Sequence, residues 1–188
     1  SWGASSCLVC MTRAQGMMNW GADDGWECYR STPEMVKVFC ENPGLVKANE
    51  FEMPKELKDD RAILCNYAKA EPTAPDSVTW EAGSTGSGAY GTGNFNKSWA
   101  MCKWTGVYST GEKRGKHKNF VDTDVPLRRV AEAYMTYAEA LFRKGESQEA
   151  LKVINNLRDT RHAEPLKELS DDILLDEWLR EFYCEGHR

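Results

Sequence analysis

The side chains best suited to chemistry lie near the N-terminus, in the segment NWGADDGWECYR. This segment places Trp20, Trp26 and Tyr29 around Asp23 and Asp24. An indole or phenol ring offers a flat apolar face to the C–H groups of a pyranose, while carboxylates accept hydrogen bonds from the sugar hydroxyls. The pattern therefore suits the recognition of a sugar. It is equally compatible with tryptophans that anchor a loop in the core, because spacing alone does not orient an indole.

A second group of aromatic residues lies between positions 80 and 108 and is interrupted by the glycine-rich run GSTGSGAYGTG. It comprises Trp80, Tyr90, Phe95, Trp99, Trp104 and Tyr108. Loops that carry such side chains on a rigid frame are common binding surfaces. We therefore add Trp80, Tyr90 and Trp99 to the candidate ligand-binding residues, which gives a candidate site without catalytic residues.

The glycine-rich run also nearly matches a phosphate-binding loop. Gly91, Lys97 and Ser98 fit the pattern, but Asn96 stands in place of its second glycine. In a phosphate-binding loop that glycine lets the backbone close around the phosphates. A surface loop is the interpretation that we adopt, and we predict no nucleotide or other cofactor.

Other chemistries find little support in the residues. Asp23 could form the pair of catalytic carboxylates of a glycosidase with Asp24 or Glu27. However, adjacent carboxylates in a glycine-rich turn more often cap the turn. A net charge of −5 and one short basic run at 113–118 argue against binding to nucleic acid. The seven cysteines are scattered and cannot all pair within one chain, and the lone CxxC at Cys7 lacks a second ligand pair, so we predict no metal site.

Three helices are predicted in residues 124–188. Apolar residues recur at spacings of three and four from Leu127 to Phe142, with Pro126 at the start and Gly145 past the end. These apolar residues are Leu127, Val130, Ala131, Tyr134, Ala138 and Leu141. Ser147 is the expected N-cap of a second helix, antiparallel to the first, and the pair is typical of a tetratricopeptide unit. A third helix is expected to start near Ser170 and to end at Gly186.

The charged residues of these helices are expected to form ion pairs that lock the frame. They are Arg128, Glu132, Glu139, Arg158, Glu177, Arg180 and Glu181. Residues 1–123, in contrast, contain thirteen of the fifteen glycines and six of the seven tryptophans, and we therefore predict a loop-rich segment that carries the ligand-binding residues. In this segment we expect a short helix at 33–40, a short strand at 63–67 and room for a hairpin within 78–108. The fold class is mainly α, a tetratricopeptide-like helical frame with long irregular loops in one domain.

The C-terminal third closely resembles the SusD/RagB family of outer-membrane nutrient-binding lipoproteins. The resemblance rests on AEAYMTYAEAL, INNLRDTR and LLDEWLREFYCEGHR. Asp59, Asp60 and Arg61 look like the family's DPR element with Asp in place of Pro, and STPEMVKVF at 31–39 resembles the family's helix after the ligand loops. Family members are two to three times longer, so we expect this chain to be an internal fragment of such a protein.

The resemblance implies a protein that binds glycans without catalysis. By resemblance, it captures an oligosaccharide at the extracellular face of the outer membrane and passes it to a SusC-like TonB-dependent transporter. Its lipid anchor is expected to lie outside this fragment. Some relatives bind peptides or other nutrients, so a non-glycan ligand remains an alternative. A tetratricopeptide-like scaffold that binds a protein partner is the second alternative, and a glycan hydrolase is the third.

Overall fold

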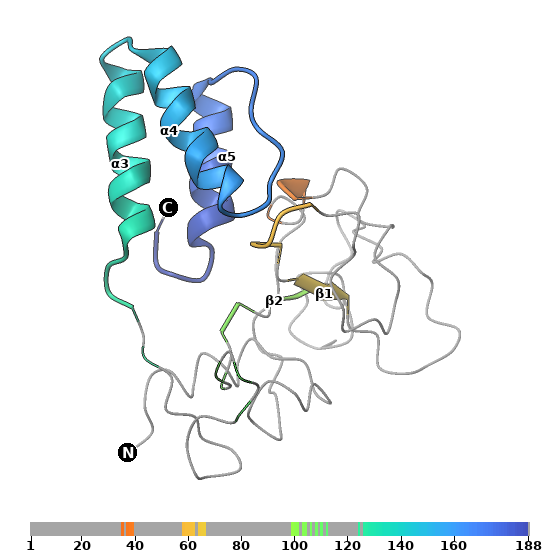
Figure 1. Ribbon diagram of the computed structural model, residues 1–188. Coiled ribbons are helices and arrows are strands. Elements are labelled where there is room, and N and C mark those ends of the chain that lie inside the picture. The colour runs from red at the N-terminus through yellow and green to blue at the C-terminus, as the bar shows by residue number, and fades with distance from the viewer. Residues whose placement is uncertain are drawn as a thin grey trace, which may run out of the picture. The chain divides into compact units, whose positions relative to one another are not determined.

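The computed structural model describes residues 58–62, 64–66, 99–101 and 126–187, with single positions at 35, 37–39, 103, 104, 106, 108, 110, 112 and 124. The chain divides into two compact units. One contains Ser1–Pro54 and Ile63–Val125, and the other contains Lys55–Ala62 and Pro126–Arg188. We call the second one the helical unit, because its described residues include three helices (Figure 1).

Helix α3 comprises Val130–Arg143 and begins three residues later than the prediction from Leu127. Its N-cap, Arg129, is extended, with φ −145° and ψ 160°, and provides no side-chain cap. The guanidinium of Arg129 instead donates to Glu181 and Glu185. These contacts explain the late start, because they hold Arg129 outside the helical conformation. Gly145, with φ +91°, ends this helix in the left-handed region, as predicted.

Helix α4 comprises Ser147–Asp159, and the prediction that Ser147 caps it is wrong. Ser147 is the first helical residue, and the N-cap is Glu146, which makes no side-chain capping bond. The side chain of Asn155 in α4 holds the connection between α4 and α5. It donates a hydrogen bond to the Leu166 carbonyl at 3.0 Å and accepts one from the Leu166 backbone amide at 2.8 Å.

Helix α5 comprises Asp171–Phe182, and its start confirms the prediction. The Ser170 hydroxyl accepts a hydrogen bond from the Ile173 amide at 3.2 Å, and two aspartates occupy the first turn near the positive end of the helix dipole. The predicted end at Gly186 is too late. The helix stops at Phe182, after which Cys184 and Gly186 take positive φ values of 60° and 75°.

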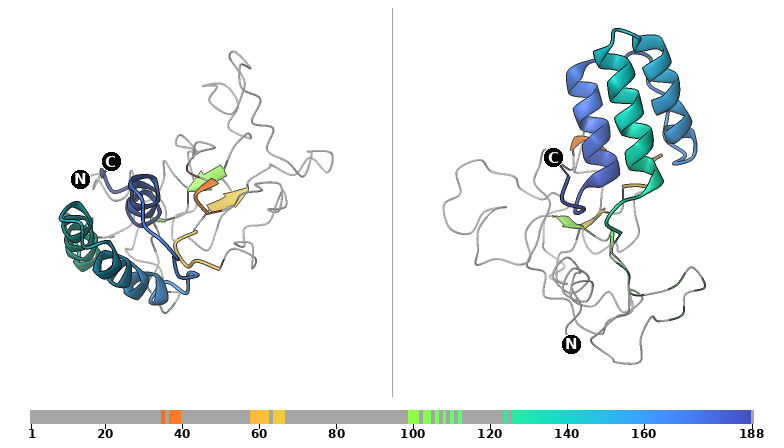
Figure 2. Two further views of the ribbon diagram at one scale, coloured as in Figure 1. Left: turned by 90° about the horizontal axis from the view of Figure 1, so that it is seen from above. Right: turned by 90° about the vertical axis from the view of Figure 1, so that its left-hand side faces the viewer.

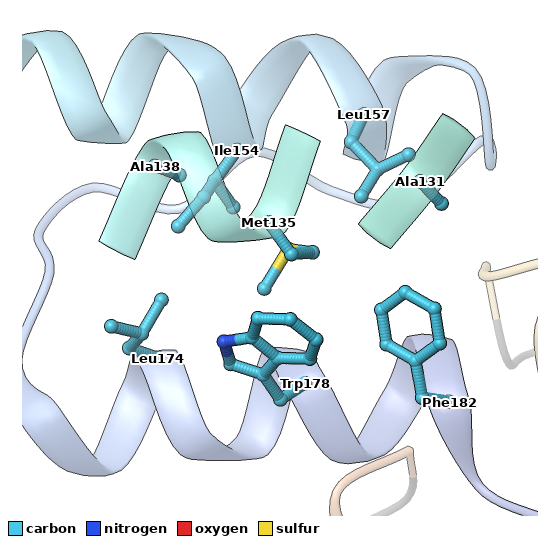
Figure 3. Close-up of a cluster of buried hydrophobic side chains, with 8 residues drawn as sticks. All are labelled: Ala131, Met135, Ala138, Ile154, Leu157, Leu174, Trp178 and Phe182. Atoms are coloured by element: carbon cyan, nitrogen blue, oxygen red, sulfur yellow. The ribbon is translucent and has the colours of Figure 1, made fainter. Parts of the chain in front are cut away.

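The core of the helical unit lies where α5 packs against both α3 and α4 (Figure 3). Figure 2 shows the three helices side by side in both views. The side chains of α5 at spacings of four point into this core and meet those of the other two helices. The core residues are Ala131, Met135, Ala138, Ile154, Leu157, Leu174, Trp178 and Phe182.

The buried face of α3 differs from the predicted stripe. Ala131 and Ala138 are buried as predicted, but Met135 lies between them and is fully buried. Leu127, Val130 and Tyr134 are exposed. Both sets have helical spacing, so the apolar arc of α3 is wider than the surface that α4 and α5 cover.

The loop-rich unit has one pair of short strands among its described residues. Strand β1, Leu64–Asn66, confirms the predicted strand, and it pairs antiparallel with β2, Trp99–Met101. The strand β2 lies within the stretch expected to hold a hairpin, but its described partner is β1. Met35 and Lys37 are helical, in agreement with the helix predicted at 33–40. In the part of the chain that the structure describes, no helix is long and apolar enough to cross a membrane.

Candidate functional site

The predicted ligand-binding residues lie almost entirely outside the described part of the chain. These are Trp20, Asp23, Asp24, Trp26, Tyr29, Trp80 and Tyr90. Trp99 is the first residue of β2, where the backbone alone is described, opposite Asn66. The site therefore stays a prediction.

Two other members of the second aromatic group are described and behave differently. Trp104 is buried, whereas Tyr108 is about half exposed. Trp104 therefore packs as a core anchor. Some aromatic residues in this stretch are therefore buried and others are exposed. Their spacing in the sequence does not tell which are which.

The most strongly interacting polar groups in the described residues form a charge cluster in the helical unit. It consists of Asp59, Arg61, Arg129, Arg158, Arg161, Glu177, Arg180, Glu181 and Glu185. Glu177 and Glu181 lie four residues apart, so they share one side of α5, next to its apolar face. Both carboxylates are almost completely buried, at 0% and 2% exposure.

Arg61 joins the segment 58–62 to this cluster. Its guanidinium forms a bidentate pair with Asp59, with both distances 2.8 Å, and donates to Glu177 at 2.7 Å and to Glu181 at 3.3 Å. Its carbonyl accepts a hydrogen bond from the Tyr183 hydroxyl at 2.8 Å. The segment is thus held to α5 through both its side chain and its backbone.

The remaining arginines complete the hydrogen bonding of the two buried carboxylates. Glu177 also accepts from Arg158 at 2.5 Å and from Arg180 at 3.0 Å. Glu181 accepts from Arg129 at 2.6 Å and from Arg161 at 2.8 Å. Buried charges are tolerated when they are paired and hydrogen-bonded in this way.

These contacts confirm the predicted frame-locking ion pairs for Arg158, Glu177, Arg180 and Glu181. Glu139 also forms one, with Arg143 at 3.6 Å. Among the described residues, no ion pair joins Arg128 or Glu132 to the cluster.

The electrostatics of the cluster favour the charged forms. Burial alone would raise the pKa of Glu181, but hydrogen bonds from Arg161 and Arg129 and their charges lower it below its ordinary value. Burial would lower the pKa of Arg61, yet its bonds and charges with Asp59 and Glu177 raise it. A general acid for glycoside hydrolysis needs a raised carboxyl pKa. Glu181 is therefore suited to holding the frame and unsuited to acid catalysis.

The helical unit also has an open pocket of about 410 Å³ along α3 and α5. It is lined by Thr136, Glu139, Ala140, Arg143, Trp178 and His187. The His187 ring stacks on Trp178, with centroids 5.8 Å apart, and the Trp178 indole donates to Glu139 at 2.9 Å. Since Trp178 is buried and already paired, this pocket offers no open indole face to a sugar. This stacking on a buried ring indicates a structural role for His187.

Sequence reasoning named six of the nine residues of the charge cluster but did not predict that they meet. It noted Arg61 through the family resemblance alone, and Arg129, Arg161, Tyr183 and Glu185 were not singled out. Arg61 and Glu177 are 116 residues apart, so no local spacing links them. The available signal was the pair of family-like motifs at 59–61 and 174–188, of which the fold brings Arg61 and Glu177 together. Within the described residues, no three His, Cys, Asp or Glu side chains are grouped to hold a metal ion.

Comparison with known proteins adds two findings. The chain matches the SusD family over residues 9–188. It is 35% identical, over 205 aligned positions, to the starch-binding protein SusD of Bacteroides thetaiotaomicron. The match covers 100% of this chain and 36% of that relative, so the chain spans about a third of the relative's length.

Proposed function

We propose that this chain, which belongs to the SusD family, is part of a protein that binds glycans at the cell surface and does not cleave them. The observation that carries the proposal is the match along the whole chain to a starch-binding relative. Starch-derived oligosaccharides are accordingly the first ligands to test. The resemblance of the helical unit to the family was visible in the sequence, and its three helices are present in the structure.

The proposed ligand-binding residues are Trp20, Asp23, Asp24, Trp26, Tyr29, Trp80, Tyr90 and Trp99. Their chemistry supports the assignment, since aromatic faces supply apolar area to sugar rings and carboxylates orient the hydroxyls. Within the helical unit, the carboxylate Glu181 has a lowered pKa and is committed to ion pairs. This is consistent with binding without catalysis.

Isothermal titration of the full-length protein with starch, plant, host and microbial oligosaccharides tests the proposal. We expect saturable binding to one class, weakened at least about tenfold when Trp20 and Trp26 are both changed to alanine, which corresponds to about 1.4 kcal/mol. Trp104→Ala is the matched control, because its indole is buried. That variant should lose stability and keep its ligand affinity once folded protein is counted. Absence of binding to every class would overturn the carbohydrate role.

The partner and the location follow from the family in the same proposal. We propose that the full-length protein is anchored by lipid at the outer membrane and delivers its ligand to a SusC-like TonB-dependent transporter. Co-purification of the two proteins from the outer membrane would support the partnership. Digestion of the full-length protein by protease added to intact cells would support its position at the cell surface. Recovery of the full-length protein in a soluble cell fraction would count against it.

One observation favours a second function, a scaffold that binds a protein. Helix α3 leaves an exposed row of apolar side chains at helical spacing, formed by Val130, Tyr134 and Tyr137, with Leu127 just before the helix. Exposed apolar rows can serve as interaction surfaces. The Trp20 and Trp26 double variant separates the two functions, since a scaffold would lose stability by about 3–5 kcal/mol per buried tryptophan and a binder would lose affinity.

A further inference from the structure

We draw no further inference here: the strongest candidate, the exposed apolar row of α3 formed by Val130, Tyr134 and Tyr137 with Leu127 just before the helix, carries nothing, because nothing in the structure shows what covers it.

Discussion

Replacement of Arg61 by methionine should destabilise the helical unit strongly, even though Arg61 lies far from α5 in sequence. The change removes donors from three carboxylates, Asp59, Glu177 and Glu181. Breaking a buried ion pair typically costs 3–5 kcal/mol. Glu177 and Glu181 each keep two other arginine partners, so we expect the lower end of that range, about 3 kcal/mol. Opening of α5 should therefore become more than about a hundredfold easier.

Arg143→Met is the matched control for this prediction. Arg143 pairs with Glu139 and Asp171, but its side chain is 55% exposed, so the same substitution should cost at most about 1 kcal/mol. Native-state hydrogen exchange of the α5 amides measures both variants in the full-length protein, because it reports the opening of this helix separately from other parts. Less than about fivefold acceleration in Arg61→Met, or equal acceleration in both variants, would refute the reasoning.

Three further predictions concern the helical unit. Ser170→Ala removes the α5 cap and should lower the free energy of unfolding by about 1 kcal/mol, as measured by thermal or denaturant unfolding. Ser147→Ala should lower it far less, because Ser147 does not cap α4. Equal losses would contradict the assigned caps. Gly145→Ala should cost about 1 kcal/mol from its positive φ alone, since no atom lies within 4 Å of the added methyl group, and an unchanged unfolding midpoint would contradict this. The lowered pKa of Glu181 means that its charged form stabilises the fold above its ordinary value of 4.5, and that this contribution disappears as the pH falls through the lowered pKa. The free energy of unfolding, measured between about pH 5 and 3, should therefore fall more steeply in the unmodified protein than in Glu181→Gln, and equal slopes would contradict the shift.

The sequence predicted the helices of the C-terminal unit because their apolar residues repeat at three and four. It failed at details that depend on distant contacts. The start of α3 moved because Arg129 is extended and bound to Glu181 and Glu185. The buried face of α3 centres on Met135, since the position of α5, and not the apolar spacing, decides which part of a wide apolar arc is covered.

The charge cluster shows the limit of local patterns most clearly. Glu177 and Glu181 could be recognised as frame charges from their spacing, but their partner Arg61 is more than a hundred positions away. Trp104 marks the same limit for the aromatic loops, because it is buried while its neighbour Tyr108 is exposed. The ligand-binding assignment therefore needs a direct test of which indoles face a ligand.

Oxidative footprinting of the full-length protein, with and without a bound oligosaccharide, provides that test. Mass spectrometry would quantify the oxidation of each tryptophan, with the buried Trp178 as an internal control. Glycan binding through the aromatic loops predicts that the ligand protects Trp20, Trp26, Trp80 or Trp99 while Trp178 stays unchanged. A tightly bound glycan that protects none of these four indoles would contradict the account.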